Sequence, residues 1–360
     1  MKQSFEVVKL SDVCNCETSN LALKNLENNF GEYSLYGASG FIKNVDFYKQ
    51  DKDYIGIVKD GAGIGRVMLL ERYSSILGTM QYIIPKENIN IKYLYYNLIK
   101  MNLSKYFTGS TIPHIYFKDY KNEKIFLRTL SEQKKISNIL DNVSKILEMK
   151  KQQLSEFDKL VKFQFLKMFG DLQNNPKGFP IVTLEELGKW SSGGTPPRAK
   201  REYYTGNIDW YSAGELNSLY LNGSLEKITT EAINNSTAKL FKAGSMLIGM
   251  YDTAAFKMGI LKKLSSSNQA CACIEPNEKI NIVWLYYALL LLKNYFLHQR
   301  RGVRQKNLNL GMIKSFKIPY VDKKEQNKFA DFIKQVDKSK VILGKALKSL
   351  SFRLNYYYMI

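Results

Sequence analysis

The sequence predicts an α+β protein built from two copies of a mixed α/β domain, each followed by a long helix, with the two helices pairing as an antiparallel coiled coil. Three observations support this prediction. Residues 131–169 and 324–359 both carry apolar side chains spaced alternately four and three residues apart, which is the pattern of a helix with one partner-facing seam. The two series are offset by a constant 193 residues. Short landmarks before the helices also recur in the same order.

The first long helix is predicted over residues 131–169, which contain neither proline nor glycine and end at Gly170. At a rise of about 1.5 Å per residue, roughly 39 residues would form a rod of roughly 58 Å, which is too long for the core of an ordinary domain and suits a spacer. Two polar residues interrupt the seam. The series is Ile136, Leu140, Val143, Leu147, Lys150, Leu154, Phe157, Val161, Gln164 and Met168.

The second long helix repeats this seam near the end of the chain. Ile136 corresponds to Phe329 and Leu154 to Leu347. Two unrelated surface helices would explain the periodicity of each stretch but not the constant offset, so we interpret the helices as copies. The second series is Phe329, Ile333, Val336, Lys340, Leu343, Leu347, Leu350, Leu354 and Tyr357.

The segments before the helices read as repeated domains with early β-rich patterning and glycines at expected turns. The stretch that begins at Phe5 recurs at Phe179, and the one at Ile89 recurs at Ile280, with offsets of 174 and 191 residues. The second copy therefore gains residues between these landmarks, and residues 191–205 are an expected place for part of that loop. The predicted boundaries are 1–130 and 171–320 for the domains, and 131–170 and 321–360 for the helices.

The charge balance favours a polyanionic partner. The chain has 53 Lys and Arg against 33 Asp and Glu, for a formal net charge of +20. A lysine-rich genome could also produce such an excess, so the position of arginine is more informative, because clustered arginine can fork onto phosphates and guanine edges. The second half contains five clustered arginines: Arg198, Arg201, Arg300, Arg301 and Arg304.

Four loops are candidate DNA contacts. Residues 300–306 place arginine, glutamine and lysine around a flexible glycine, a set that can read guanine or adenine or hold phosphate, although a solvated basic loop would look the same. Residues 108–114 occupy the equivalent place in the first domain, and residues 36–43 and 195–203 combine glycine, aromatic and basic residues. The candidates are Tyr36, Ser39, Lys43, Ser110, Thr111, His114, Arg198, Lys200, Arg201, Tyr203, Arg300, Arg301, Arg304, Gln305 and Lys306.

The sequence predicts no catalytic residue, cofactor or metal. Residues 60–65 are rich in glycine but do not follow the GxGxxG spacing, and they lie within strand-like chain, so a turn between strands is the better interpretation. The cysteine pairs Cys14/Cys16 and Cys271/Cys273 have a single-residue spacing on predicted strands, which favours core positions over zinc ligation. Few cysteines, no apolar signal core and no long apolar run together predict a cytoplasmic protein without a membrane anchor.

The order of several short motifs resembles one known family, the specificity (S, HsdS) subunits of type I restriction-modification systems. The likeness extends over essentially the whole chain and rests on the joint order of the motifs, because each alone is weak. The matching pieces in the first half are residues 36–40, 60–65 and 132–133, and those in the second half are residues 179–184, 192–196, 206–210, 268–276 and 325–326.

This resemblance implies two target recognition domains, each of which reads one half of a bipartite site in double-stranded DNA. It also implies that the helices set the spacing between the half-sites and dock two methyltransferase subunits. Restriction and translocase subunits would join this core for cleavage. The specificity subunit itself would be non-catalytic.

A second hypothesis comes from a different class of protein. The basic charge would also suit a stand-alone nucleic-acid enzyme, a nuclease or DNA methyltransferase with an unrecognised active site. Turnover of labelled S-adenosylmethionine with DNA by the chain alone would distinguish this enzyme from a non-catalytic subunit.

Overall fold

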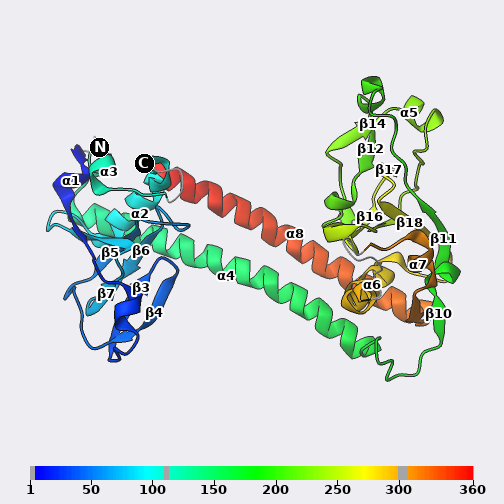
Figure 1. The fold of residues 1–360 in the computed structure, drawn as a ribbon, viewed down its shortest axis with the longest axis horizontal. Coiled ribbons are helices and arrows are strands. Elements are labelled where there is room, and N and C mark those ends of the chain that lie inside the picture. The colour runs from blue at the N-terminus through cyan, green and yellow to red at the C-terminus, as the bar shows by residue number, and fades with distance from the viewer. Residues whose placement is uncertain (1–4, 109–112, 299–306, 360) are drawn as a thin grey trace. The chain divides into compact units, whose positions relative to one another are not determined.

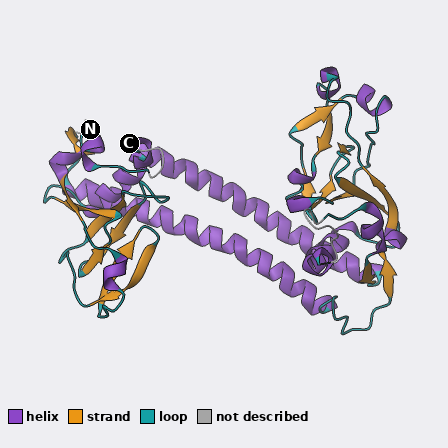
Figure 2. Ribbon diagram, in the orientation of Figure 1, coloured by secondary structure: helices purple, strands orange, loops and turns teal. Residues whose placement is uncertain are grey.

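The structure is a computed structural model that describes residues 5–108, 113–298 and 307–359, with the backbone alone for 355–359. Contacts divide the chain into two compact units, one formed by residues 1–152 with 344–360 and the other by residues 153–343. Each unit combines strands, short helices and part of both long helices (Figures 1 and 2). The predicted α+β fold class is confirmed.

The first unit is a four-stranded sheet of order β2-β8-β5-β6, a three-stranded sheet of order β4-β3-β7 and the pair β1-β9. Helix α2 packs its buried leucines against the larger sheet. The strands are β1 (Glu6–Lys9), β2 (Cys14–Thr18), β3 (Tyr33–Gly37), β4 (Gly40–Val45), β5 (Tyr54–Val58), β6 (Val67–Leu70), β7 (Ser74–Ile76), β8 (Met80–Pro85) and β9 (Lys124–Leu127). The helices are α1 (Leu10–Val13), η1 (Leu23–Leu26), α2 (Ile91–Met101), η2 (Leu103–Tyr106) and α3 (Phe117–Tyr120).

The second unit has a five-stranded sheet of order β11-β18-β15-β16-β13, a three-stranded sheet of order β14-β12-β17 and the pair β10-β19. The strands are β10 (Ile181–Thr183), β11 (Gly188–Ser192), β12 (Ile208–Tyr211), β13 (Tyr220–Leu221), β14 (Glu226–Ile228), β15 (Met246–Gly249), β16 (Met258–Leu261), β17 (Ser266–Ser267), β18 (Cys271–Pro276) and β19 (Lys317–Pro319). The helices are η3 (Leu184–Leu187), η4 (Arg201–Tyr204), η5 (Ala213–Glu215), α5 (Thr230–Asn234), η6 (Asp252–Ala254), α6 (Ile282–Leu297) and α7 (Leu310–Ser315).

The two units share one topology, which confirms the predicted repeat. In both, a three-stranded sheet contains one antiparallel and one parallel pair, β3-β4 with β3-β7 and β12-β14 with β12-β17. The small antiparallel pairs even keep their register: Val8 lies opposite Ile125, and Val182 lies opposite Ile318. These four residues obey the offsets of 174 and 193 found in the sequence.

The expected position of the extra loop was wrong. Residues 19–32 connect β2 to β3, and residues 193–207 connect β11 to β12, so these connections are nearly equal in length. The added chain lies later, where residues 212–225 replace the tight β3-β4 turn and where residues 229–245 separate β14 from β15. A change in the sequence offset shows that residues were gained somewhere between two landmarks, but it does not show at which position. The glycine- and proline-rich stretch was misleading because a turn-forming composition does not imply an insertion.

The long helices are α4 (Leu130–Phe169) and α8 (Lys323–Met359). In the second unit they run antiparallel, because Phe165 packs edge-to-face on Phe329 while the earlier Asp158 binds the later Lys340 at 2.6 Å. Every described seam position of both helices is buried or half-buried, whereas most positions between them are exposed, as a coiled-coil seam requires. The polar interruption Lys340 thus has a partner on the facing helix.

A buried glutamine joins each domain to its long helix. The Gln326 side chain donates to the backbone carbonyl of Val321 at 2.7 Å and accepts from the backbone amide of Asn281 at 2.6 Å. Asn281 caps α6, since its side chain accepts from two backbone amides of the first turn. Gln133 makes the same contacts in the first unit, donating to Arg128 and accepting from Asn90, the cap of α2.

Replacing Gln326 with Ala should therefore lower the free energy of unfolding of the second unit by about 1–3 kcal/mol, because the mutation leaves buried backbone groups unpaired. Trp190, Trp210 and Trp284 all lie in this unit, so tryptophan fluorescence during chemical denaturation measures its unfolding. Gln335→Ala, at an exposed position of the same helix, is the control. A decrease in the free energy of unfolding no larger than that of the control would contradict this role of Gln326.

Candidate nucleic-acid interface

Three loops of the first unit meet at one edge and form the first loop cluster, residues 36–41, 59–66 and 113–115. Arg66 follows the turn between β5 and β6, and its guanidinium donates to the backbone carbonyl of Ala38 in the β3-β4 turn at 2.6 Å. His114 Nδ1 lies 2.6 Å from the Asp60 carboxylate. The backbone amide of Gly61 donates to the carbonyl of Pro113. These contacts hold together loops that are distant in the sequence.

The second unit contains the same arrangement, the second loop cluster, residues 212–215, 250–257 and 307–308. The Lys257 ammonium donates to the backbone carbonyl of Gly214 at 3.4 Å, as Arg66 does to Ala38. The backbone amide of Asp252 donates to the Asn307 side chain at 3.0 Å. By offsets of 191 and 193 residues, Asp252 and Asn307 are the counterparts of Gly61 and His114.

Buried residues fix the third loop of each cluster, residues 113–115 and 307–308, which we call the returning loop. The backbone amide of Ile115 donates to the carbonyl of Lys59, and that of Leu308 donates to the carbonyl of Met250. Ile115 and Leu308 are both buried in the core of their unit. The chain enters the clusters at residues 113 and 307, directly after segments that lie outside the described residues.

The turn beside each returning loop has the same unusual backbone. Gly61 and Gly65 have φ values of +86° and +79°, and the counterparts Asp252 and Phe256 have φ values of +47° and +58°. A positive φ is uncommon for a residue with a side chain and costs conformational energy. Phe256 adopts a positive φ while its ring is buried and stacked on the ring of Phe296. Core packing therefore stabilises this turn in the second unit, where no glycine occupies the position. The predicted turn between strands at residues 60–65 is confirmed.

The candidates of the first unit have different roles, and Lys43 lies outside the first loop cluster. Ser39 is exposed at the β3-β4 turn, and Tyr36 is half-buried against the ring of Phe41. The Lys43 ammonium donates to two backbone carbonyls at 2.8 and 3.2 Å and lies over the ring of Phe30, so it stabilises a loop. His114, partly exposed, anchors the returning loop through Asp60.

The candidates at residues 198–203 lie in the connection between β11 and β12, which includes the short helix η4. Arg198 forms a two-pronged ion pair with Glu226 at 2.5 and 2.9 Å and stacks over Trp210. Each partner stabilises the charge of the other, so Glu226 raises the pKa of Arg198 and Arg198 lowers the pKa of Glu226. Tyr203 is buried, while Lys200 and Arg201 are exposed. The side chain of Arg198 is thus already engaged, and Tyr203 belongs to the core.

The remaining candidates fall in the two segments that precede residues 113 and 307. They lie outside the residues that the structure describes, so their assignment stays a prediction. These candidates are Ser110, Thr111, Arg300, Arg301, Arg304, Gln305 and Lys306.

Sequence reasoning missed Arg66 and Lys257. Each is a single basic residue outside the arginine clusters, yet each links two loops at an equivalent place. The signal that could have found them is their offset of 191 residues, the same as for the neighbouring landmarks. A basic residue that recurs at the spacing of a repeat is more informative than an isolated one.

The cysteines occupy core positions, as predicted. Cys14 and Cys16 lie on β2, and burial raises the pKa of these thiols to about 12 and about 11. Cys271 and Cys273 are fully buried on β18. Within the part of the chain that the structure describes, no three metal-ligating side chains gather, and no helix is long and apolar enough to cross a bilayer.

Comparison with known proteins gives the family. A family model described as the type I restriction modification DNA specificity domain matches residues 2–157 and, a second time, residues 176–350. The chain belongs to this family. The two matches coincide with the two repeats, so the recurring loop clusters belong to two copies of one specificity domain.

Individual relatives agree with this assignment. The chain is 26% identical to the EcoR124I/EcoR124II specificity subunit of Escherichia coli over 69% of its own length and 63% of that protein. It is 24% identical to the MjaVIII specificity subunit of Methanocaldococcus jannaschii over 83% and 76% of the two chains. The chain thus spans less than two thirds of the E. coli relative. In fold it is similar to the S subunit of M. genitalium, with a TM-score of 0.68, 16% identity and coverage of 99% and 96%.

Removing an anchor should loosen the returning loop. In Asp60→Ala the His114 side chain loses its partner, so the backbone amides of His114 and Ile115 should exchange hydrogen faster. Asn307→Ala should have the same effect on the amides of Asp252 and Leu308. Hydrogen exchange followed by mass spectrometry measures both, with the exposed Asp51→Ala as control. Unchanged exchange in both anchor variants would show that the core contacts alone hold the loops.

Proposed function

We propose that this chain is the DNA specificity subunit of a type I restriction-modification complex. It binds double-stranded DNA in a sequence-specific manner and carries no catalytic step itself. The observation that carries the proposal is the recurrence of one loop cluster in both specificity domains. A protein that reads two half-sites needs a similar contact surface in each of its two domains. The net charge of +20 supplies the attraction to phosphate that such binding requires.

Each domain reads one half of a bipartite site. The domain of residues 1–130 uses the first loop cluster with residues 109–112, and the domain of residues 171–320 uses the second loop cluster with residues 299–306. Phosphate contacts position a protein on DNA, whereas base contacts specify the sequence. Exposed Ser39 and the arginine-rich segment are suited to contact DNA, whereas Arg198 and Lys43 are engaged by partners within the chain.

The helices set the distance between the half-sites and bind the partner subunits. Their seams are used within the chain, yet large apolar side chains remain exposed on other faces of both helices: Met149 and Phe163 on α4 and Phe352 on α8. Exposed apolar stripes of this kind mark protein interfaces. Because the helices are copies, they offer similar surfaces twice, which suits two identical methyltransferase subunits. Restriction and translocase subunits join this core for cleavage.

A comparison of modified genomes tests the proposal. Deleting the chain from a host that retains the partner subunits should abolish methylation at one bipartite motif, and restoring it should restore that motif. The same purified chain with DNA and labelled S-adenosylmethionine should show no transfer in the absence of partners. Turnover by the chain alone would favour the stand-alone enzyme.

Arg304→Ala or Gln305→Ala should weaken reading of the second half-site only, by about 1–3 kcal/mol for each lost bidentate base contact. The physical reason is that each domain reads its own half-site. Methylation-sensitive sequencing of cells that express each variant gives the outcome, with Lys314→Ala as a control because Lys314 pairs with Glu185. If both halves of the motif degrade equally, Arg304 and Gln305 hold phosphate or the fold and do not read bases.

Lengthening both helices by one heptad should change the spacing and leave both half-sites intact. Seven residues inserted after Gln153 and after Ala346 keep the seam in phase and add about 10.5 Å of helix. At about 3.4 Å per base pair, the spacer of the modified motif should grow by roughly three base pairs. Insertion into one helix alone should misalign the seam and destabilise the protein. A folded, active double insertion that still marks the original spacing would show that the helices are not the ruler.

A further inference from the structure

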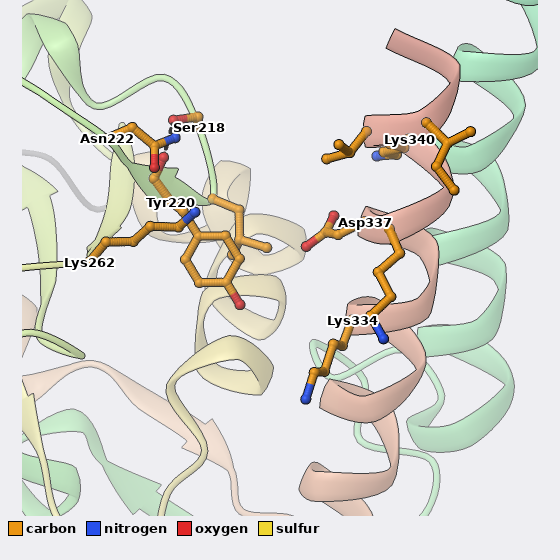
Figure 3. A pocket seen from close by; sticks show the side chains of 11 residues that line it. Ser218, Tyr220, Asn222, Lys262, Lys334, Asp337 and Lys340 are labelled. Atoms are coloured by element: carbon orange, nitrogen blue, oxygen red, sulfur yellow. Dashed lines mark hydrogen bonds between the residues drawn. The ribbon is translucent and has the colours of Figure 1, made fainter. Parts of the chain in front are cut away.

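A groove of about 770 Å³ lies in the second unit between α8 and the edge strand β13. Figure 3 shows Tyr220 and Lys262 on one wall, facing Lys334, Asp337 and Lys340 of α8 on the other. Its volume is that of a typical ligand or peptide site. Besides these residues the groove is lined by Ser218, Leu219, Asn222, Lys338, Val341 and Ile342.

The charge of the groove is strongly positive. Four lysines line it against one carboxylate, that of Asp337. Lys340 is bound to Asp158, and Lys262 lies over the ring of Tyr220 at 5.1 Å. Lys334 and Lys338 are exposed on the rim. An occupant with carboxylates of its own would meet complementary charge on this side.

The lining of the groove is apolar as well as charged. Val341 and Ile342 are 56% and 70% exposed on consecutive positions of α8, outside its seam. Leu219 and Tyr220, at the start of β13, also line the groove. Such side chains gain free energy when another apolar surface covers them. The half-buried Asp337 lies beside them, and burial raises its pKa.

The first repeat lacks the features that make this groove. The counterpart of Lys334 is Asp141, whose carboxylate is bound by Lys92 and by the Tyr96 hydroxyl at 2.5 and 2.7 Å. The counterpart of Lys262 is Glu71. Strand β13 belongs to the insertion at residues 212–225, which replaces a tight turn in the first repeat. Within the described residues, the first repeat therefore lacks both the lysines and the added edge strand that form this groove.

We propose that this groove binds an acidic, partly apolar peptide segment of a partner protein, in one copy per chain. This inference rests on the proposed function, because the partner is a methyltransferase subunit of the same complex. The carboxylates of the segment pair with Lys334 and Lys338 on the rim, and its apolar side chains cover Ile342. DNA fits less well, because a phosphate backbone offers nothing to the apolar lining.

Charge reversal on the rim tests the electrostatic part. Lys334→Glu with Lys338→Glu should weaken binding of the purified partner subunits, measured without DNA, by about tenfold or more, because like charges then oppose each other. Lys239→Glu with Lys242→Glu is the matched control, since it changes net charge equally at exposed positions of the same unit outside the groove. Unchanged partner binding, or equal weakening in the control, would overturn the proposal.

Cross-linking identifies the occupant. A photoreactive residue at Ile342 in the assembled complex should cross-link to an acidic peptide of one partner subunit, at no more than one copy per chain. The same residue at Leu225, which is exposed in the same unit outside the groove, should not. Cross-linking of Ile342 to DNA, or to no partner peptide, would refute the inference. If the complex still assembles and methylates its motif in that case, the proposed function stands and only the groove assignment fails.

Discussion

The buried glutamine at the start of each long helix is the contact on which the proposed ruler depends. A rod can set a distance only if each domain is held rigidly on it. Gln326 does this by satisfying the carbonyl that ends the preceding loop and the amide of Asn281, so the start of α8 and the cap of α6 share one set of hydrogen bonds. Since Gln133 repeats the arrangement, both domains meet their helix in the same way.

The two loop clusters share one backbone arrangement but carry different side chains. The backbone contacts of the turn recur in both units, and so do its two left-handed positions. The side chains at those positions differ, with Gly61 and Gly65 in one turn and Asp252 and Phe256 in the other. Backbone hydrogen bonds and buried anchors maintain this arrangement, which leaves the exposed residues free to vary. Under the proposed function, this separation of scaffold and contact would let the two domains contact different DNA sequences.

The insertion in the second repeat breaks the internal symmetry of the chain. It adds β13 to the edge of the larger sheet and supplies one wall of the lysine-lined groove, while the first repeat has an ion pair at the corresponding helix position. Duplicated surfaces suit partners that bind twice. The insertion therefore gives the second half of the chain a surface that the first half lacks.

The sequence alone determined the repeat, the two helices and their seams, because a heptad period and a constant offset are local patterns that survive without knowledge of the fold. It also indicated the family through the order of short motifs. Only the tertiary structure decided the place of the insertion, the engagement of Arg198 by Glu226 and the burial of Tyr203. It alone revealed Arg66 and Lys257 as links between loops. The physical reason is that these properties depend on contacts between residues far apart in the chain, and composition does not tell whether a charged side chain faces solvent or an internal partner.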